Sequence, residues 1–158
     1  MNEAMPYGDV KPRHFGPPVL AMPAIHVATD ADKPFMLALA REKYPGRNID
    51  LGIPWVERCM ANPDRLVLVG PNSFGIAQAD WLYGFERRGR LDMLCARPQP
   101  GVALEALRMV RMMVGWAKSR GCLGTFKLDA DTGVDFGPFA RRLGGVKVTS
   151  VRYEIPLE

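Results

Sequence analysis

Histidine, cysteine and long apolar runs are scarce in this chain of 158 residues, and each shortage excludes a class of protein. The three cysteines lie far apart in apolar surroundings, without a nearby histidine, which favours reduced core thiols over a disulfide framework. Two histidines, His14 and His26, are too few for a zinc centre, so we expect no metal site. No apolar run is long enough to cross a bilayer, and the first residues lack the basic-then-apolar layout of a signal peptide. We therefore expect a soluble, cytoplasmic protein.

The composition predicts one globular domain with an appendage. Hydrophobic residues make up 47% of the chain, enough for a core in a domain of this length. Residues 1–24 are rich in proline and glycine and show no periodicity, so we expect an extended arm that can contact another protein chain, followed by a single domain over 25–158. The net charge of +4 is compatible with an acidic partner, such as a nucleotide cofactor or nucleic acid, and equally with a mixed solvated surface.

The stretch from Leu91 to Gly121 is the organising part of the chain. An apolar run typical of a buried strand is followed by the proline-rich loop 97–101 and by a long helical pattern that ends at Gly121. Glu105, Arg108 and other charged residues fall on the side of that helix predicted to face solvent. The free N–H groups of the first helical turn can hold a phosphate, although any α/β protein needs such a connection.

Hydrophobic periodicity and turn residues predict the remaining elements. Helices are expected from about Asp30 to Tyr44, from Ile53 to Met60 and from Phe136 to Leu143. Strands are expected at 25–29, at 65–70 and 73–82 as an antiparallel hairpin, at 125–129 and within 146–157.

Charged and nucleophilic residues near the central strand are candidates for chemistry. Arg87, Arg88 and Arg90 follow the hairpin and either steer an anionic ligand or form a solvated hairpin tip. Asp92 can act as a base through water if it is buried, but carboxylates on the solvent face of a sheet are common. Cys95 is either a nucleophile or a buried structural thiol, and the second interpretation is favoured.

The order β-α-α-β-β-β-α-β-α-β(-β) over residues 25–157 resembles the GNAT superfamily of acetyl-CoA-dependent N-acetyltransferases. The resemblance implies an α/β (α+β) fold in which a mixed, mostly antiparallel central sheet is flanked by helices. A set of short motifs is also similar to GNAT-like proteins encoded by bacteriophages: Arg97-Pro98, Trp116-Ala117-Lys118, Gly121, Thr132-Gly133, Phe139 with Arg142-Leu143-Gly144, and Tyr153.

This resemblance also implies a slot for acetyl-CoA between the fourth and fifth strands. In the superfamily the pantetheine arm pairs with the backbone of the fourth strand, which here comprises Met93, Leu94, Cys95 and Ala96. The pyrophosphate rests on the loop and helix start, which here comprise Gln99, Gly101, Val102, Ala103 and Leu104. Backbone donors polarise the thioester carbonyl, a base such as Asp92 removes the proton of the acceptor amine, and an acid protonates the leaving thiolate.

The chain departs from the superfamily pattern at two positions. The loop pattern Q/R-x-x-G-x-G/A reads Pro98-Gln99-Pro100-Gly101-Val102-Ala103, so that two prolines remove potential N–H donors to phosphate. Ala140 stands where many members place the tyrosine that protonates the thiolate.

Two functions therefore remain open. The first is an acyl-CoA-dependent N-acyltransferase that acts on an amine of a protein or small molecule, in the host cytoplasm if the chain is phage-encoded. The second is a catalytically inactive GNAT-fold structural or assembly protein, placed in a phage virion, with the arm of residues 1–24 holding a neighbouring chain. Nucleic-acid binding through the arginines is disfavoured, because no aromatic residues are interleaved with them to stack on bases.

Overall fold

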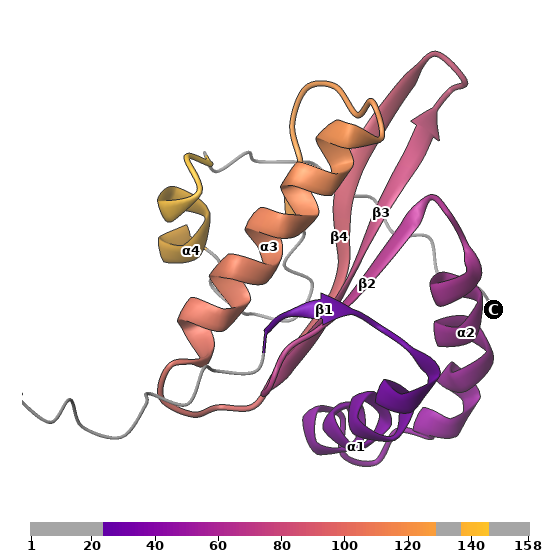
Figure 1. The fold of residues 1–158 in the computed structure, drawn as a ribbon, viewed down its shortest axis with the longest axis vertical. Coiled ribbons are helices and arrows are strands. Elements are labelled where there is room, and N and C mark those ends of the chain that lie inside the picture. Colours follow the sequence, from indigo (N-terminus) through magenta and orange to yellow (C-terminus); the bar gives the residue numbers. More distant parts are fainter. Residues whose placement is uncertain (1–23, 129–136, 146–158) are drawn as a thin grey trace, which may run out of the picture.

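The computed structural model describes residues 24–128 and 137–145, which form one mixed sheet with helices on both faces (Figure 1). The strands lie side by side in the order β1-β2-β3-β4-β5, with antiparallel pairing from β1 to β4 and parallel pairing between β4 and β5. The strands span His26–Val27 (β1), Arg65–Val69 (β2), Ser73–Leu82 (β3), Glu86–Ala96 (β4) and Lys127–Leu128 (β5). The expected mixed, mostly antiparallel sheet flanked by helices is confirmed. The arm of residues 1–23, the loop at Thr132-Gly133 and the strands expected within 146–157 lie outside the described residues.

The helices begin and end close to the predicted positions. They span Lys33–Lys43 (α1), Ile53–Ala61 (α2), Val102–Ser119 (α3) and Gly137–Arg142 (α4), with short 3-10 turns at Asp30–Asp32 and Ile49–Gly52. Pro34 and Pro54 occupy the first turns of α1 and α2, where the missing N–H is not needed for the helix. The cationic side chains of Arg41, Lys43 and Arg58 lie in last turns, where the helix dipole favours positive charge.

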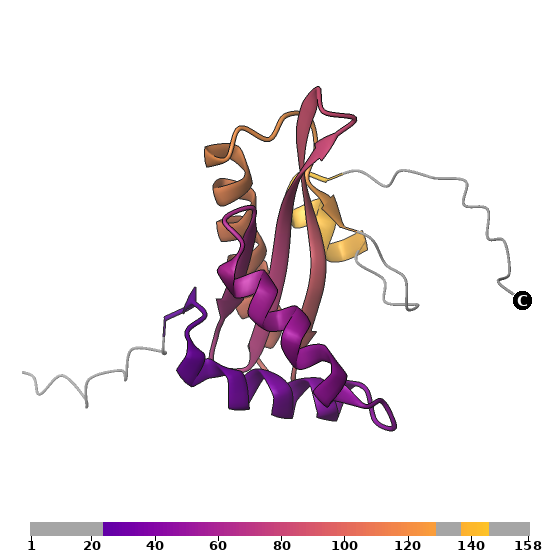
Figure 2. The same cartoon turned by 90° about the vertical axis from the view of Figure 1, so that its right-hand side faces the viewer.

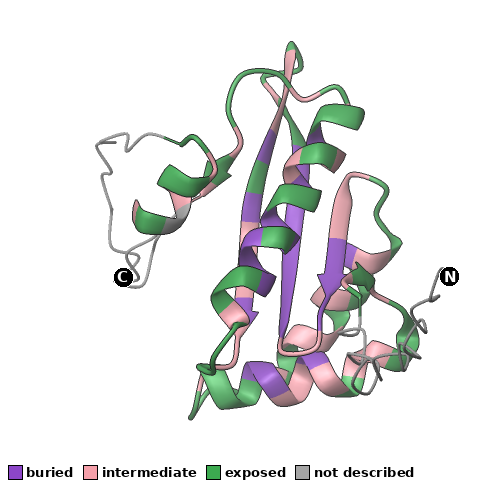
Figure 3. Cartoon of the chain, turned by 60° about the vertical axis from the view of Figure 1, so that its left-hand side comes forward, coloured by how far each residue is buried: buried purple, intermediate pink, exposed green. Residues whose placement is uncertain are grey.

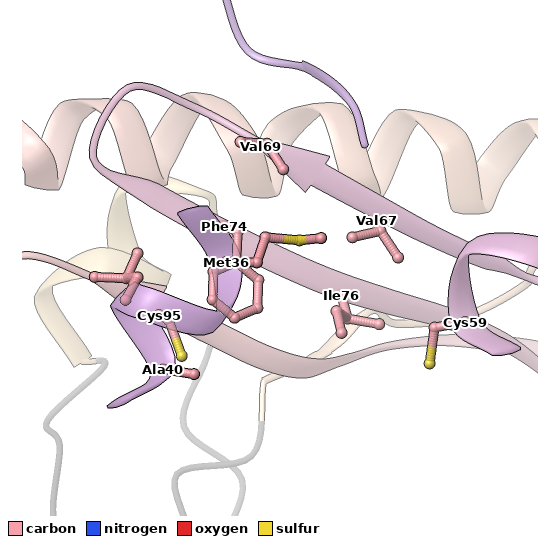
Figure 4. Close-up of a cluster of buried hydrophobic side chains, with 9 residues drawn as sticks. Met36, Ala40, Cys59, Val67, Val69, Phe74, Ile76 and Cys95 are labelled. Carbon is pink, nitrogen blue, oxygen red and sulfur yellow. The ribbon is translucent and has the colours of Figure 1, made fainter. Parts of the chain in front are cut away.

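α1 and α2 cover one face of the sheet and bury a cluster of apolar side chains against it (Figure 4). Met36, Leu39 and Cys59 of the helices are each about 1% exposed, and Phe74 and Ile76 of β3 meet them from the sheet. This core lies between the sheet and the two N-terminal helices, α1 and α2.

α3 covers the opposite face, and its residues alternate between buried and exposed along the helix (Figure 3). Glu105, Met109, Met113 and Ala117 recur every four residues and are all buried. The sheet residue beneath Met113 is Gly75, at which an added Cβ would lie 2.7 Å from the Met113 methyl carbon. The sheet therefore lacks side chains where the helix approaches most closely.

β4 begins earlier than predicted, at Glu86 instead of Leu91, and this changes the position of three arginines. Arg87, Arg88 and Arg90 pair with Trp81, Asp80 and Gln78 of β3, inside the sheet and not at a solvated hairpin tip. The turn itself comprises residues 83–85, and the hairpin projects beyond the helices (Figure 2). Periodicity missed this strand because its charged side chains have partners within the fold.

Arg87 is held by partners from two other parts of the chain. Its guanidinium pairs with the carboxylate of Asp64 and donates a hydrogen bond to the carbonyl oxygen of Arg120, 2.9 Å away. The Arg120 side chain also contacts Asp64, at 3.0 Å, and these two cations hold the pKa of Asp64 below its ordinary value. Asp64 therefore joins β4 to the end of α3, and Arg87 is not available to steer a ligand.

His26 provides a pH dependence at the edge of the sheet. Its Nδ1 lies 3.2 Å from the Ala24 carbonyl oxygen and its Nε2 3.1 Å from Asp32 Oδ1, and these contacts raise the pKa of His26, the backbone contact contributing most. A raised pKa gives stabilisation that is complete below the unfolded value near 6.5 and is lost as the pH rises through the folded value. Because the side chain is half exposed, the effect on Tm is at most about 2 °C.

Thermal unfolding between pH 6 and pH 8.5 measures this effect. We expect the wild type to exceed His26→Gln in Tm at pH 6 and to match it at pH 8.5. A Tm difference that stays constant across this range would contradict the assignment.

Candidate acyl-CoA site

β4 and β5, between which the cofactor slot is predicted, are parallel and pair over only two positions in the described residues. Arg90 pairs with Lys127 and Leu91 with Leu128, and the register between β3 and β4 shifts immediately afterwards. Ile76 faces Met93 while Ala77 faces Leu91, so Asp92 is the extra residue of a β-bulge. From Asp92 to Ala96, β4 keeps β3 on one side and has no described strand on the other.

The alternation of antiparallel hydrogen bonds identifies which backbone groups face this open edge. The N–H of Arg97 donates to the Asn72 carbonyl oxygen at 3.0 Å, so Arg97 directs its N–H toward the side of β3, while the Asn72 N–H donates to Glu105. Bonded and non-bonded pairs alternate, so Cys95 and Met93 direct their N–H and C=O groups toward β3. Leu94 and Ala96 direct theirs toward the open edge. Of the four strand residues predicted to bind the cofactor, these two present backbone donors to the slot.

The loop after β4 leads from this edge to the start of α3. Gly101 adopts a φ of 84°, a left-handed conformation that glycine tolerates without strain, and it begins the helix. The Val102 N–H donates to the Gln99 carbonyl oxygen at 3.3 Å, and the Leu104 N–H donates to that of Gly101 at 3.1 Å. Within the described part of the chain, the N–H groups of Gly101 and Ala103 have no acceptor. Two donors therefore remain at the positive end of the helix.

Arg97 holds the loop to α1 and does not face the helix start. Its Nε and Nη2 lie 3.0 and 2.8 Å from the two carboxylate oxygens of Glu42, and its guanidinium stacks over the Phe35 ring. Such a two-bond pairing fixes the guanidinium in one plane. The first residue of the loop is thus anchored on the opposite side of the sheet from α3.

Glu105 is buried, although the sequence placed it on the solvent side of α3. Only 5% of the residue is exposed, and its carboxylate accepts hydrogen bonds from the Ser73 hydroxyl at 2.5 Å and the Asn72 N–H at 3.0 Å. Glu105 lies in the first turn of α3, and its carboxylate accepts the hydrogen bonds of the β2–β3 turn. Periodicity does not predict this burial, because the carboxylate is stabilised by a hydrogen bond from Ser73, which lies 32 residues away in sequence.

Asp92, the predicted base, faces α2 with both carboxylate oxygens engaged by arginines. Arg65 Nη1 donates to Oδ2 at 2.7 Å, and Arg90 Nε lies 2.9 Å from Oδ1, while 12% of the Asp92 side chain is exposed. The arginines come from β2 and from β4 itself, so Asp92 cross-links the sheet at the bulge. A proton transfer to Asp92 has to proceed alongside these contacts, and its catalytic role stays a prediction.

Asp92→Asn is expected to lower the free energy of unfolding by about 2 kcal/mol, because it leaves the half-buried Arg65 without its counter-charge. Chemical denaturation measures this change. Asp50→Asn, which breaks an exposed pair with Arg41, is the matched control and should change the free energy by less than about 0.5 kcal/mol. Equal effects of the two variants would rule out a structural role for the Asp92 ion pairs.

Cys95 lies in the apolar core beneath α1 and is fully buried. Burial raises the pKa of its thiol to about 11, so the thiol stays protonated near neutral pH. The side chain of Cys95 belongs to the core, and its backbone N–H and C=O groups point toward β3, so Cys95 presents no donor to the candidate slot. This agrees with the interpretation of Cys95 as a structural thiol.

A cavity of about 160 Å³ opens between α1, α2 and the sheet, and the sequence gave no indication of it. Its floor is formed by Phe74 of β3 and Met93 of β4, next to the bulge. The cavity and the slot thus lie beside consecutive residues of one strand.

Two further features bear on the chemistry of the described residues. Ala140, at the position of the expected proton donor, lies in α4 and has no group that can donate. No cluster of three or more histidine, cysteine, aspartate or glutamate side chains is placed to bind a metal ion within residues 24–128 and 137–145.

None of the helices described has the length and apolar character that a membrane span requires.

The fold matches solved acetyltransferase structures over most of its length. The 6'-N-acetyltransferase AAC(6')-Ig of Acinetobacter haemolyticus aligns with a TM-score of 0.69 and 20% identity over 85% of this chain and 99% of its own. Glucosamine-6-phosphate N-acetyltransferase of Arabidopsis thaliana gives a TM-score of 0.64 at 16% identity, covering 85% and 98%. AAC(6')-Iy, solved with a bisubstrate analogue that contains CoA, gives 0.65 at 15% identity, covering 85% and 97%. No protein-family model matches the sequence, and no curated protein matches it either.

Proposed function

We propose that this chain, whose fold is that of the GNAT acetyltransferases, is an acyl-CoA-dependent N-acyltransferase acting on an amine of a small molecule or protein. The observation that carries the proposal is the edge of β4 after Leu91, which has no partner strand within the described residues and leads to N–H groups at the start of α3 that have no acceptor there. A strand edge and a helix start in this order provide donors for an extended acyl chain and for a phosphate.

The residues of the slot fit acetyl-CoA as the acyl donor. Acetyl-CoA, when bound, supplies the acetyl group as a thioester. The N–H groups of Leu94 and Ala96 are available to pair with the pantetheine arm or to polarise the thioester carbonyl. Gly101 and Ala103 donate to the pyrophosphate at the positive end of α3. Pro98 and Pro100 donate nothing, so binding relies on these two amides.

The side chains favour direct transfer to the amine over a covalent enzyme intermediate. Cys95 is protonated and buried, which removes it as a nucleophile. Asp92 is the candidate base, acting through water from its position at the bulge. Because Ala140 cannot donate a proton, water protonates the departing sulfur.

Calorimetric titration of the full chain with acetyl-CoA tests the proposal. We expect saturable binding with a Kd between about 1 μM and 1 mM, the usual range of substrate affinities for enzymes. The same preparation should release free CoA thiol when an amine acceptor is added. Absence of binding at millimolar acetyl-CoA would overturn the enzyme assignment.

A second function, a GNAT-fold structural or assembly protein without catalysis, is favoured by the same departures in sequence. The two loop prolines and Ala140 remove groups that the acetyltransferase pattern provides. For this function we propose that residues 1–24 hold a neighbouring chain and that the assembly is a phage virion. A protein that fails to bind acetyl-CoA but associates with other virion chains would support this function.

A further inference from the structure

We propose that the cavity between α1, α2 and the sheet receives the acceptor, and that this acceptor is a primary amine joined by a short linker to a single ring of about the size of phenyl. The inference rests on the proposed function, and it specifies the substrate class of that site.

The size and lining of the cavity point to an aromatic or similarly compact apolar group. Its volume of about 160 Å³ is close to that of the cavity of about 150 Å³, lined by apolar side chains, that binds benzene in an engineered protein. The apolar wall comes from both helices and both strands and includes Met36, Leu37, Ile53, Trp55, Phe74 and Met93. Figure 4 shows Met36 and Phe74, two of these lining residues, next to each other in the buried cluster. A ring in the cavity removes apolar area from water, which is the main favourable term for such a ligand.

The charges of the cavity argue against a polycationic acceptor. Lys33 and Glu57 are the charged residues that line it, and they pair with each other at 2.9 Å. Lys33 also contacts Asp30 at 2.9 Å, so its ammonium is shared between two carboxylates, and Glu57 is the one acidic residue among those that line the cavity. A second or third ammonium group would enter an apolar space without a counter-charge, which costs several kcal/mol. The apolar lining also favours the neutral, nucleophilic form of a single amine.

The position of the cavity calls for a short linker. Met93 lines the cavity, and the next residue, Leu94, presents its backbone N–H to the slot. Consecutive Cα atoms are about 3.8 Å apart, so the cavity and the slot adjoin along β4, and we expect a linker of a few bonds to bring an amine from a ring in the cavity to the edge of the strand. There the amine nitrogen forms a bond to the thioester carbonyl carbon, the carbon–sulfur bond breaks, and the proton lost by nitrogen balances the thiolate released.

Binding of amines to the full chain without acyl-CoA tests the inference apart from catalysis. We expect 2-phenylethylamine to bind by calorimetry and to raise Tm, and spermidine to bind at least tenfold more weakly. Gly52→Phe and Val56→Phe place a ring at two lining positions, and each should weaken 2-phenylethylamine binding at least tenfold. Leu51→Phe is the matched control, because Leu51 is 77% exposed and does not line the cavity.

The outcomes separate this inference from the proposed function. Binding of 2-phenylethylamine that both filling variants weaken, with the Leu51→Phe variant unchanged, supports the cavity as the acceptor site. Tighter binding of spermidine, or unchanged binding in both filling variants, overturns the inference even if acetyl-CoA binds. If the amine binds as expected but acetyl-CoA does not, the cavity stands as a ligand site and the acyltransferase function fails.

Discussion

Ala103→Glu is expected to weaken acetyl-CoA binding at least 100-fold, a loss of about 2.7 kcal/mol. Ala103 is exposed in the first turn of α3, and its N–H is one of two free donors there. A carboxylate about 4 Å from a phosphate oxygen near the protein surface is repelled by roughly 4 kcal/mol. The helix itself tolerates the change, because a negative charge at its N-terminus is favourable. Calorimetric titration of the variant with acetyl-CoA measures the loss.

Ala103→Gln is the matched control, since it has nearly the same size as the glutamate and carries no charge. Its Kd for acetyl-CoA should stay within about threefold of the wild type if the loss in Ala103→Glu is electrostatic. Equal losses in the two variants would mean that bulk, not charge, blocks the site. Wild-type affinity in Ala103→Glu would remove the start of α3 from the phosphate site altogether.

Glu105→Ala should lower the free energy of unfolding by about 3 kcal/mol, the second large effect. The Ser73 hydroxyl is fully buried and the Asn72 N–H half-buried, and both lose a charged acceptor. Each buried donor left without a partner costs roughly 1–3 kcal/mol. Denaturant unfolding, with the slope compared between the proteins, measures the change. A cost below about 1 kcal/mol would show that water replaces the carboxylate.

Gly70 allows an independent check of the same contact. A Cβ at this position would lie 2.5 Å from Glu105 Oε1, so Gly70→Ala should destabilise the wild type by about 2 kcal/mol. In the Glu105→Ala background that oxygen is absent, and Gly70→Ala should cost much less. A double-mutant cycle with a coupling below about 0.5 kcal/mol would contradict the observed packing.

Much of the fold was predictable because local patterns and tertiary packing agree along most of the chain. The stripe of Met109, Met113 and Ala117 has helical spacing and faces the sheet as expected. Pro34 and Pro54 begin helices, and the β2–β3 hairpin has its predicted antiparallel pairing. In each case residues close together in sequence are enough to predict the element.

The candidate site was less predictable because it depends on partners distant in sequence. Glu105 was assigned to the surface, since only the folded chain brings Ser73 and Asn72 to its carboxylate. The first residues of β4 were assigned to a hairpin tip, because the sequence does not show the partners of Arg87. In the fold its guanidinium contacts the carboxylate of Asp64 and the carbonyl oxygen of Arg120, which come from other elements. The cavity has no sequence signature, because its lining residues have the ordinary spacing of two core-facing helices.

The short pairing of β4 with β5 bears on the free energy needed to separate these two strands. In the described residues only Arg90–Lys127 and Leu91–Leu128 join them, whereas β3 and β4 pair along their full length. Opening that seam breaks a few backbone hydrogen bonds and removes Phe126 and Leu128 from the core beneath α3, while α1 and α2 stay packed on β2, β3 and β4. We therefore expect the described part of β5 to separate from β4 at less than the global unfolding free energy, with the core beneath α1 and α2 intact.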